Sequence, residues 1–298
     1  MAGTKIVVGY DGSQSSRAAL GWALGAASGR GLSVLIVHAL RQPIGTLAGL
    51  ASYVKPAEDS FRAGAERMLA EAEHASRLEQ PSVDLASCLV EGPPVPVLLE
   101  QLADAEMGVV GGHGLSTFAE LLLGSTSFQL VTYAPCPIVA VRSRDYSATG
   151  PEAGRVVVGV DGLEDSADAV GFAFEEASLR GTGLTAVHAW ETPFYDLPAR
   201  GIPAPDRRFF DDVERSELCV LSEALAGWRE QYPEVDVRQA LVRGEPAAAL
   251  VDASAGAELV VVGSRGRGGF RSLLLGSVSH AVLQHARSAV AVVRPHRP

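Results

Sequence analysis

The chain has 298 residues, enough for two domains of ordinary size, because a single hydrophobic core usually serves about 100–150 residues. Its formal net charge of −10 works against broad binding to nucleic acid, whose affinity depends largely on Lys and Arg contacts with phosphates. Apolar runs are short, none approaches the ~20 residues of a membrane-spanning helix, and the N-terminal segment lacks a signal-peptide core. We therefore expect a cytoplasmic protein without membrane or nucleic-acid partners, in which any anion site is local.

Three cysteines, Cys88, Cys136 and Cys219, are scattered without CxxC spacing. Neither a zinc site nor a disulfide framework is indicated. We expect all three to be reduced and buried, as free cysteines usually are.

An internal repeat divides the chain. Residues 5–24 (KIVVGYDGSQSSRAALGWAL) are answered by residues 155–174 (RVVVGVDGLEDSADAVGFAF), an offset of 150. The segments LVEGPPVPVLLE and VVGGHG of the first half match LVRGEPAAALVD and VVGSRG of the second at an offset of 152. Self-similarity of this kind indicates two homologous domains. We expect domains at 1–143 and 155–298, joined by a polar linker at 144–154 that is rich in Gly, Ser and Pro.

Each repeat predicts the same elements in chain order. In the first, a β-branched strand at 5–10 is followed by an Ala-rich helix at 15–27, a second strand at 32–39, a variable segment and another helix. Strand, helix, strand, glycine-rich loop, helix and strand complete the unit. Short apolar strands alternating with helices indicate a parallel sheet covered on both faces. The predicted fold class is α/β, with two tandem doubly wound, Rossmann-like, five-stranded sheets of order 3-2-1-4-5.

Two features of these elements are specific. The long helix of the second repeat shows one apolar stripe, which we expect to be buried; it comprises Phe210, Val213, Leu218, Leu221, Leu225 and Trp228. The last strands, at 137–142 and 289–294, lie at a sheet edge in the predicted order. Because an open apolar edge invites aggregation, we expect them to be covered by pairing with one another or with another chain.

The predicted order brings two sets of loops together. Ligands of doubly wound sheets bind beyond the carboxyl ends of the strands where the strand order reverses, here between strands 1 and 4. Strand 1 ends at Asp11 and Asp161, and strand 4 runs into a G-x2-G-x9-G-S motif in both repeats. Its members are Gly111, Gly114, Gly124 and Ser125 in the first repeat, and Gly263, Gly266, Gly276 and Ser277 in the second.

This motif is suited to phosphate. Glycine lets the backbone approach oxyanions closely, and the Gly-Ser pair opens a helix whose free N–H groups and dipole favour an anion. The spacing differs from the Walker loop and from the dinucleotide fingerprint. Arg265, Arg267 and Arg271 add positive charge in the second repeat, whereas the first has His113 and Glu120.

Simpler structural interpretations stand beside the functional ones. Asp11 and Asp161 precede a glycine and fit an Asx turn or a helix cap. His38 and His188 recur at the end of strand 2, where a hydrogen-bonded core histidine is the commoner finding. The arginines of the second loop fit a solvated rim equally well, and both glycine loops fit plain turns.

With these motifs the chain resembles the universal stress protein family in its tandem-domain form. The resemblance covers the chain apart from variable segments near 41–57 and 192–207. It implies ATP as the ligand, with phosphates held by the glycine motifs. It further implies that Asp11 and Asp161 contact the ribose or a bound Mg²⁺, that the backbone of Ala39 and Ala189 meets adenine, and that the last strand mediates a homodimer.

Three functions remain open from the sequence. The first is a nucleotide-dependent regulator of stress or growth state. The second is a slow ATP-hydrolysing enzyme related to ATP pyrophosphatases, although the strand-1 loops YDGSQSS and VDGLEDS lack the two consecutive glycines of that class, and neither glycine loop contains a lysine. The third is a nucleotide-free dimeric scaffold.

Overall fold

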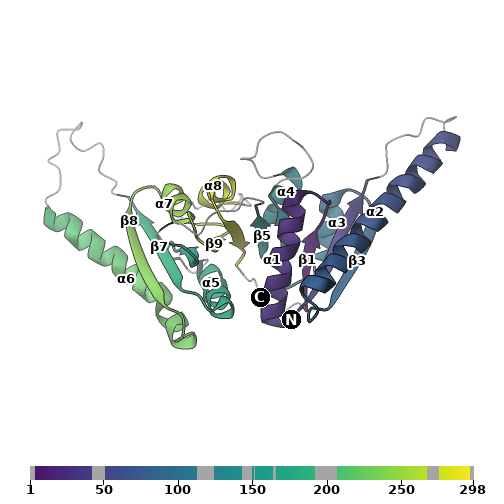
Figure 1. Cartoon of the computed structure of the whole chain (residues 1–298). Coiled ribbons are helices and arrows are strands. Elements are labelled where there is room, and N and C mark those ends of the chain that lie inside the picture. Colours follow the sequence, from purple (N-terminus) through teal and green to yellow (C-terminus); the bar gives the residue numbers. More distant parts are fainter. Residues whose placement is uncertain are drawn as a thin grey trace, which may run out of the picture. The chain divides into compact units, whose positions relative to one another are not determined.

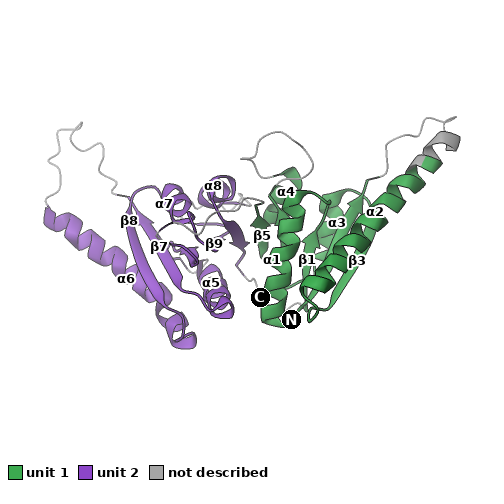
Figure 2. Cartoon of the chain, in the orientation of Figure 1, with its two compact units in different colours: residues 1–145 green, residues 146–298 purple. Residues whose placement is uncertain are grey.

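A computed structural model describes residues 4–41, 51–112, 124–142, 150, 152–163, 166–191, 207–266 and 275–295. For residues 51–55 and 57 it describes only the helical backbone. The chain divides into two compact units, Met1–Asp145 and Tyr146–Pro298, which we call unit 1 and unit 2 (Figure 2). This division falls within the predicted linker, whose limits stay a prediction.

Unit 1 alternates strands and helices along the chain (Figure 1). Its elements are β1 (Lys5–Gly9), α1 (Gln14–Arg30), β2 (Ser33–Leu40), α2 (Ala51–Glu79), β3 (Leu85–Glu91), α3 (Pro94–Gln101), β4 (Met107–Gly111), α4 (Ser125–Tyr133) and β5 (Ile138–Val141).

Unit 2 repeats this order. Its elements are β6 (Val156–Gly159), α5 (Ala167–Arg180), β7 (Leu184–Trp190), α6 (Arg207–Gln231), β8 (Val237–Arg243), α7 (Pro246–Ala253), β9 (Leu259–Gly263), α8 (Ser277–His285) and β10 (Ala289–Val293).

All strand pairs within a unit are parallel, and the pairing gives the same order in both. Unit 1 has β3-β2-β1-β4-β5, and unit 2 has β8-β7-β6-β9-β10. The predicted α/β class with a parallel sheet in each repeat is confirmed. The chain reverses direction across the sheet between β1 and β4, and between β6 and β9. Right-handed crossovers then place α1 and α2 on one face and α3 and α4 on the other, and α7 and α8 pack together in the same way in unit 2.

The core consists of the apolar strand residues and the helix faces that cover them. Val7, Val8 and Val109 are buried in unit 1, as are Val157 and Val261 in unit 2. In unit 2, an aromatic cluster joins helices α5 and α6. The Phe174 ring lies 6.4 Å from that of Trp228 and 5.9 Å from that of Tyr232, burying a large apolar area.

One residue of the predicted α6 stripe is wrong. Leu221 and Leu225 are fully buried, but Leu218 is 41% exposed. The helical period places Glu217, four residues before Leu221, on the inward side instead. Its carboxylate lies 2.7 Å from the ring of buried His188. Glu217 therefore faces inward, where hydrophobic spacing predicted Leu218.

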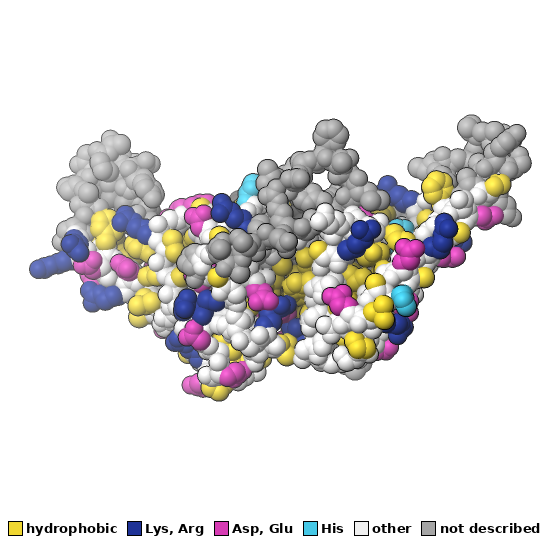
Figure 3. Space-filling view, in the orientation of Figure 1, with side chains coloured by type: hydrophobic (Ala, Val, Ile, Leu, Met, Phe, Trp, Pro, Cys, Tyr) yellow, Lys and Arg dark blue, Asp and Glu magenta, His cyan; other side chains and the backbone are white. Residues whose placement is uncertain are grey.

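The surface of the described residues is mixed in charge. Basic and acidic side chains are interspersed over the face drawn in Figure 3, without a broad region of one sign. Among the described residues, no helix combines the length and the apolarity needed to cross a membrane. The three cysteines are free, but none is fully buried, contrary to expectation: Cys88 and Cys136 are partly buried, and Cys219 on α6 is exposed. Burial raises the pKa of the Cys136 thiol to about 12, so this thiol stays protonated.

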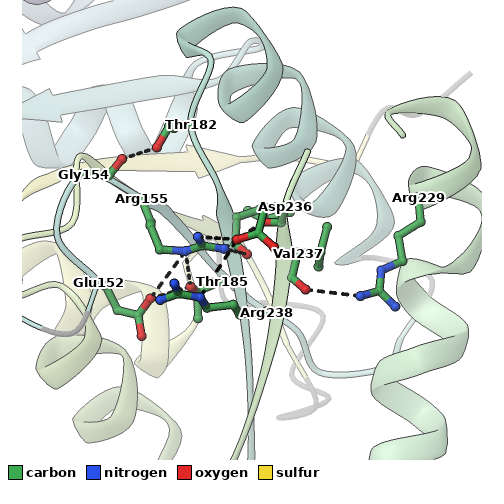
Figure 4. A network of polar contacts seen from close by, with 10 residues as sticks. Glu152, Gly154, Arg155, Thr182, Thr185, Arg229, Asp236, Val237 and Arg238 are labelled. Carbon is green, nitrogen blue, oxygen red and sulfur yellow. Dashed lines mark hydrogen bonds and ion pairs between the residues drawn. The ribbon is translucent and has the colours of Figure 1, made fainter. Parts of the chain in front are cut away.

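An arginine network closes the amino ends of the strands in unit 2 (Figure 4). Buried Arg155 donates from Nε to Thr185 Oγ1 at 3.0 Å and from Nη2 to the carbonyls of Leu184 and Asp236 at 2.8 and 2.7 Å. Its Nη1 lies 2.7 Å from the Asp236 carboxylate. The corresponding residue of unit 1, Lys5, makes an ion pair with Asp104. Only arginine has enough donors for this network.

We expect Arg155→Met to lower the free energy of unfolding by about 1–2 kcal/mol at neutral pH, because two carbonyl oxygens lose their donor. Arg238→Met is the matched control: Arg238 lies 4.0 Å from the same carboxylate but is well exposed, so its loss should change stability by less than about 0.5 kcal/mol. Denaturant unfolding measures both. Equal effects of the two substitutions would contradict a structural role of the network.

The same comparison has a pH dependence. The hydrogen bond from Arg155, and then its charge, holds the pKa of Asp236 below its ordinary value. A carboxyl with a lowered folded pKa stabilises the protein above its unfolded pKa and loses that contribution as the pH falls through the folded pKa. The difference between wild type and Arg155→Met should therefore shrink in acid.

Candidate nucleotide site

The two strand-1 aspartates adopt the same local structure. Asp11 follows β1 and accepts a hydrogen bond through Oδ1 from the backbone of Ser13 at 3.0 Å. Asp161 follows β6 and accepts one through Oδ1 from Leu163 at 3.0 Å. Both are Asx turns, and each is followed by a glycine with φ near +75°, which L side chains rarely adopt. The turn uses Oδ1, one of the two carboxylate oxygens.

In unit 2 that second oxygen lies towards the glycine loop. A Cβ placed on Gly266 would come within 3.2 Å of Asp161 Oδ2. These residues are far apart in the sequence, and they meet because β6 and β9 are adjacent. The structure therefore brings together the aspartate and the second glycine of the motif, and the missing side chain of Gly266 keeps the space before the carboxylate open.

The glycine motifs close into the same turn in both units. Gly124 N–H donates to the Gly112 carbonyl at 2.7 Å in unit 1. Gly276 N–H donates to the Ser264 carbonyl at 2.8 Å in unit 2. Gly124 and Gly276 are the N-caps of α4 and α8, and neither helix start has a side-chain cap. First-turn N–H groups of a helix are orphan donors, here beside the loop that approaches the aspartate.

Two serines that sequence reasoning missed hold these helix starts against the strands. Ser127 Oγ donates to the Gly111 carbonyl at 2.7 Å, and Ser279 Oγ donates to the Gly263 carbonyl at 2.5 Å. The signal was present, because GSTS at 124–127 and GSVS at 276–279 share the second serine as well as the first. Ser125 and Ser277 are the first helical residues.

The first glycine of the motif has a packing role in unit 1. A Cβ on Gly111 would come within 2.7 Å of Ser15 Oγ and 2.8 Å of the Ser15 carbonyl carbon. The carboxyl end of β4 therefore packs directly against the start of α1. This contact requires glycine for close approach, independently of any ligand.

The histidines at the ends of β2 and β7 fix the same edge of each sheet. His38 Nδ1 lies 2.7 Å from the Tyr10 carbonyl, and His188 Nδ1 lies 2.7 Å from the Val160 carbonyl. Both carbonyls belong to the residue just before a strand-1 aspartate. Ala39 and Ala189 follow these histidines, so their backbone lies beside the Asp11 and Asp161 loops.

The two histidines differ in their second contact. His188 Nε2 lies 2.7 Å from Glu217 Oε2, whereas Ala65 stands at the position of Glu217 in the first repeat. Both ring nitrogens of His188 therefore have a hydrogen-bonding partner, a carbonyl and a carboxylate. Both histidines serve structure, as the simpler interpretation predicted.

Part of the predicted site lies outside the described residues, namely His113, Gly114, Glu120, Arg267 and Arg271. The structure describes Arg265, whose Cα is 3.6 Å from the Cβ position of Gly276. No group of three or more His, Cys, Asp or Glu side chains suited to a metal ion occurs among the described residues. A cation at Asp11 or Asp161 would need further oxygen ligands from a bound molecule.

The chain belongs to the universal stress protein family, whose model matches residues 3–142 and again residues 152–294. The resemblance predicted from the glycine motifs is confirmed. The chain is 40% identical over 295 residues to universal stress protein Rv2005c of Mycobacterium tuberculosis strain H37Rv, covering 97% of this chain and 96% of the relative. It is 38% identical over 299 residues to universal stress protein Rv2623 of the same strain, covering 97% and 96%.

A solved structure supports the fold. A universal stress protein from Archaeoglobus fulgidus DSM 4304 superposes with a TM-score of 0.69 at 19% identity, covering 99% of both chains. At this identity the likeness concerns the fold and carries nothing about ligands.

Proposed function

We propose that this protein binds ATP with Mg²⁺ in up to two sites per chain and acts as a nucleotide-dependent regulator of stress or growth state. The observation that carries the proposal is the approach of Gly266 to Asp161 Oδ2. Gly266 borders the carboxylate, and its neighbour Arg265 lies against Gly276, where a helix starts without a side-chain cap. Such a space suits a ligand with an anionic end for the helix and a hydroxyl or metal for the carboxylate.

Each residue of the site has a proposed role. The backbone at the starts of α4 and α8, with the hydroxyls of Ser125 and Ser277, binds phosphate oxygens. Asp11 and Asp161 bind the ribose or share a Mg²⁺ with the phosphates. The backbone of Ala39 and Ala189 meets adenine. The glycines of the two motifs, including Gly114, allow the backbone to approach, and Arg265 adds a charged donor in unit 2.

A regulatory role fits this site better than rapid hydrolysis. Neither glycine loop contains a lysine, and the strand-1 loops lack the consecutive glycines of ATP pyrophosphatases. His38 and His188 hold backbone carbonyls through Nδ1, which engages them in structure. Occupancy of the sites would instead change which partners the protein binds.

The experiment that tests the ligand is mass spectrometry of small molecules released by denaturing freshly purified protein. ATP, or ADP derived from it, is expected at up to two molecules per chain. Release of a cyclic nucleotide would replace ATP as the ligand. Protein that carries no nucleotide and takes none up from millimolar ATP with Mg²⁺ would support the scaffold alternative instead.

We also propose a homodimer. β5 and β10 lie at one edge of their own units' sheets and contain no charged residue that would discourage edge pairing. Light scattering should give a mass of twice the 31.1 kDa of one chain. A monomer at every concentration tested would contradict the proposal.

A further inference from the structure

In each unit, an arginine follows the last strand and lies next to the start of the glycine loop. Arg142 follows β5, and Arg294 follows β10. The residue before each accepts a hydrogen bond from the loop: Gly112 N–H donates to the Val141 carbonyl and Ser264 N–H to the Val293 carbonyl, both at 2.7 Å. The two arginines therefore occupy equivalent places, at the edge where the phosphate-binding helix begins.

In unit 1 the Arg142 side chain lies against Gly112. A Cβ on Gly112 would come within 3.3 Å of Arg142 Cγ, so the aliphatic part of the arginine lies alongside the glycine that precedes the loop. Gly112 also closes the turn into α4 through its carbonyl, at 2.7 Å from Gly124 N. Arg142 thus lies against the turn that leads into the helix start.

In unit 2 a second arginine, Arg265, lies beside the helix start. Burial, and then the charge of Arg265, lowers the pKa of Arg294. Arg265 itself lies against Gly276, the N-cap of α8. An arginine remains protonated near neutral pH, so two positive charges are held near one another and near the positive end of a helix. The positive charge is local, because the whole chain carries a formal net charge of −10.

This arrangement suits an anion. Arg294 is partly buried, and the charge of Arg265 acts on it. A phosphoryl group has several oxygens and accepts from two guanidinium groups at once, through charge-assisted and often bidentate hydrogen bonds. The helix start beside them adds backbone donors for the same group.

We infer that Arg294, together with Arg265, binds the terminal phosphates of a nucleoside polyphosphate in unit 2, and that Arg142 does so in unit 1. The inference rests on the proposed function and deepens it, because it makes these arginines the residues that select polyphosphates over cyclic or monophosphate nucleotides. Sequence reasoning missed them because they lie outside the glycine motif.

The test is calorimetric titration of Arg294→Gln with ATP, ADP, cyclic AMP and inorganic tripolyphosphate, in a Gly114→Val background that leaves unit 2 as the only intact site. ATP and tripolyphosphate should bind about tenfold more weakly than to the background protein, which corresponds to the loss of one charge-assisted contact. ADP should lose less, and cyclic AMP should be unaffected. Arg294→Lys keeps the charge without the planar donor pair and should fall between.

Arg287→Gln is the matched control. Arg287 is exposed and precedes β10, at the opposite end of the strand from Arg294. It removes the same charge from the same unit and should leave all four titrations unchanged. Thermal unfolding without ligand should show that Arg294→Gln folds, so that a loss of binding is not a loss of structure.

The outcomes separate this inference from the proposed function. Unchanged ATP affinity in Arg294→Gln and Arg294→Lys, or equal losses for ATP and cyclic AMP, would overturn the role of Arg294 and leave ATP binding intact. Tripolyphosphate binding that depends on Arg294, in a protein that does not bind ATP, would keep the anion site and refute the nucleotide. Binding of neither compound would refute both.

Discussion

Replacing Gly266 with valine is expected to weaken ATP binding in unit 2 at least about a hundredfold, equivalent to about 2.8 kcal/mol or more. The first side-chain carbon already comes within 3.2 Å of Asp161 Oδ2, and the two methyl groups of valine would fill the space before the carboxylate and the helix start. Calorimetry should then show the loss of one site per chain while the site in unit 1 remains.

The substitution should leave the fold intact, which makes the result interpretable. Gly266 is exposed, and its backbone lies outside the left-handed region that only glycine adopts readily. Gly266→Ala should give a smaller loss, because a single methyl needs a shift of only a few tenths of an ångström. Gly227→Ala on α6, where a Cβ meets no atom within 4 Å, is the control. If Gly266→Val binds ATP with unchanged stoichiometry and affinity, the loop does not bind phosphate.

The two sites are expected to differ about ten- to a hundredfold in ATP affinity, and unit 2 should fill first. Each unit has an arginine after its last strand, Arg142 in unit 1 and Arg294 in unit 2. Near the start of the glycine loop, however, unit 2 has Arg265 where unit 1 has His113. Arg267 and Arg271 add charge to the second loop, where the first has Glu120. Well-placed charge-assisted hydrogen bonds contribute roughly 1.5–3 kcal/mol each, and exposure lowers that figure, so one or two effective contacts account for the expected range.

Single-site proteins measure this difference directly. Gly114→Val leaves the site in unit 2, and Gly266→Val leaves the site in unit 1. Adding Arg265→Gln to the first should bring the two affinities closer together. If the unmodified sites bind ATP equally, or if unit 1 binds more tightly, the arginines of the second loop are solvent-exposed surface residues without a role in binding.

The repeat and the glycine motifs made much of this molecule predictable. Once both halves read strand, helix, strand and glycine loop, the parallel sheets followed, and the edge where Asp161 meets Gly266 followed from the order of the strands. These features depend on local patterns that recur in both halves of the chain, so a pattern found in one repeat supports the same interpretation in the other.

Residues whose roles arise from packing between distant segments were not predictable in the same way. Glu217 was passed over for Leu218 because hydrophobic spacing gives no weight to a carboxylate, and only the facing His188 explains its inward position. Arg155 and Lys5 are equivalent in the repeat, yet Arg155 builds a network that includes Asp236, 81 residues further along the chain, because lysine lacks the forked donors of arginine. A role for Arg294 could not be predicted from its place at the end of a strand, because the role depends on the charge of Arg265, which comes from another strand.

The most direct test of the central claim is calorimetric titration of ligand-free wild-type protein with ATP in the presence of Mg²⁺. Two binding events per chain are expected, with the tighter one lost in Gly266→Val and the weaker one lost in Gly114→Val. Absence of binding at millimolar ATP, or binding that neither substitution changes, would contradict the assignment of the two glycine motifs to nucleotide.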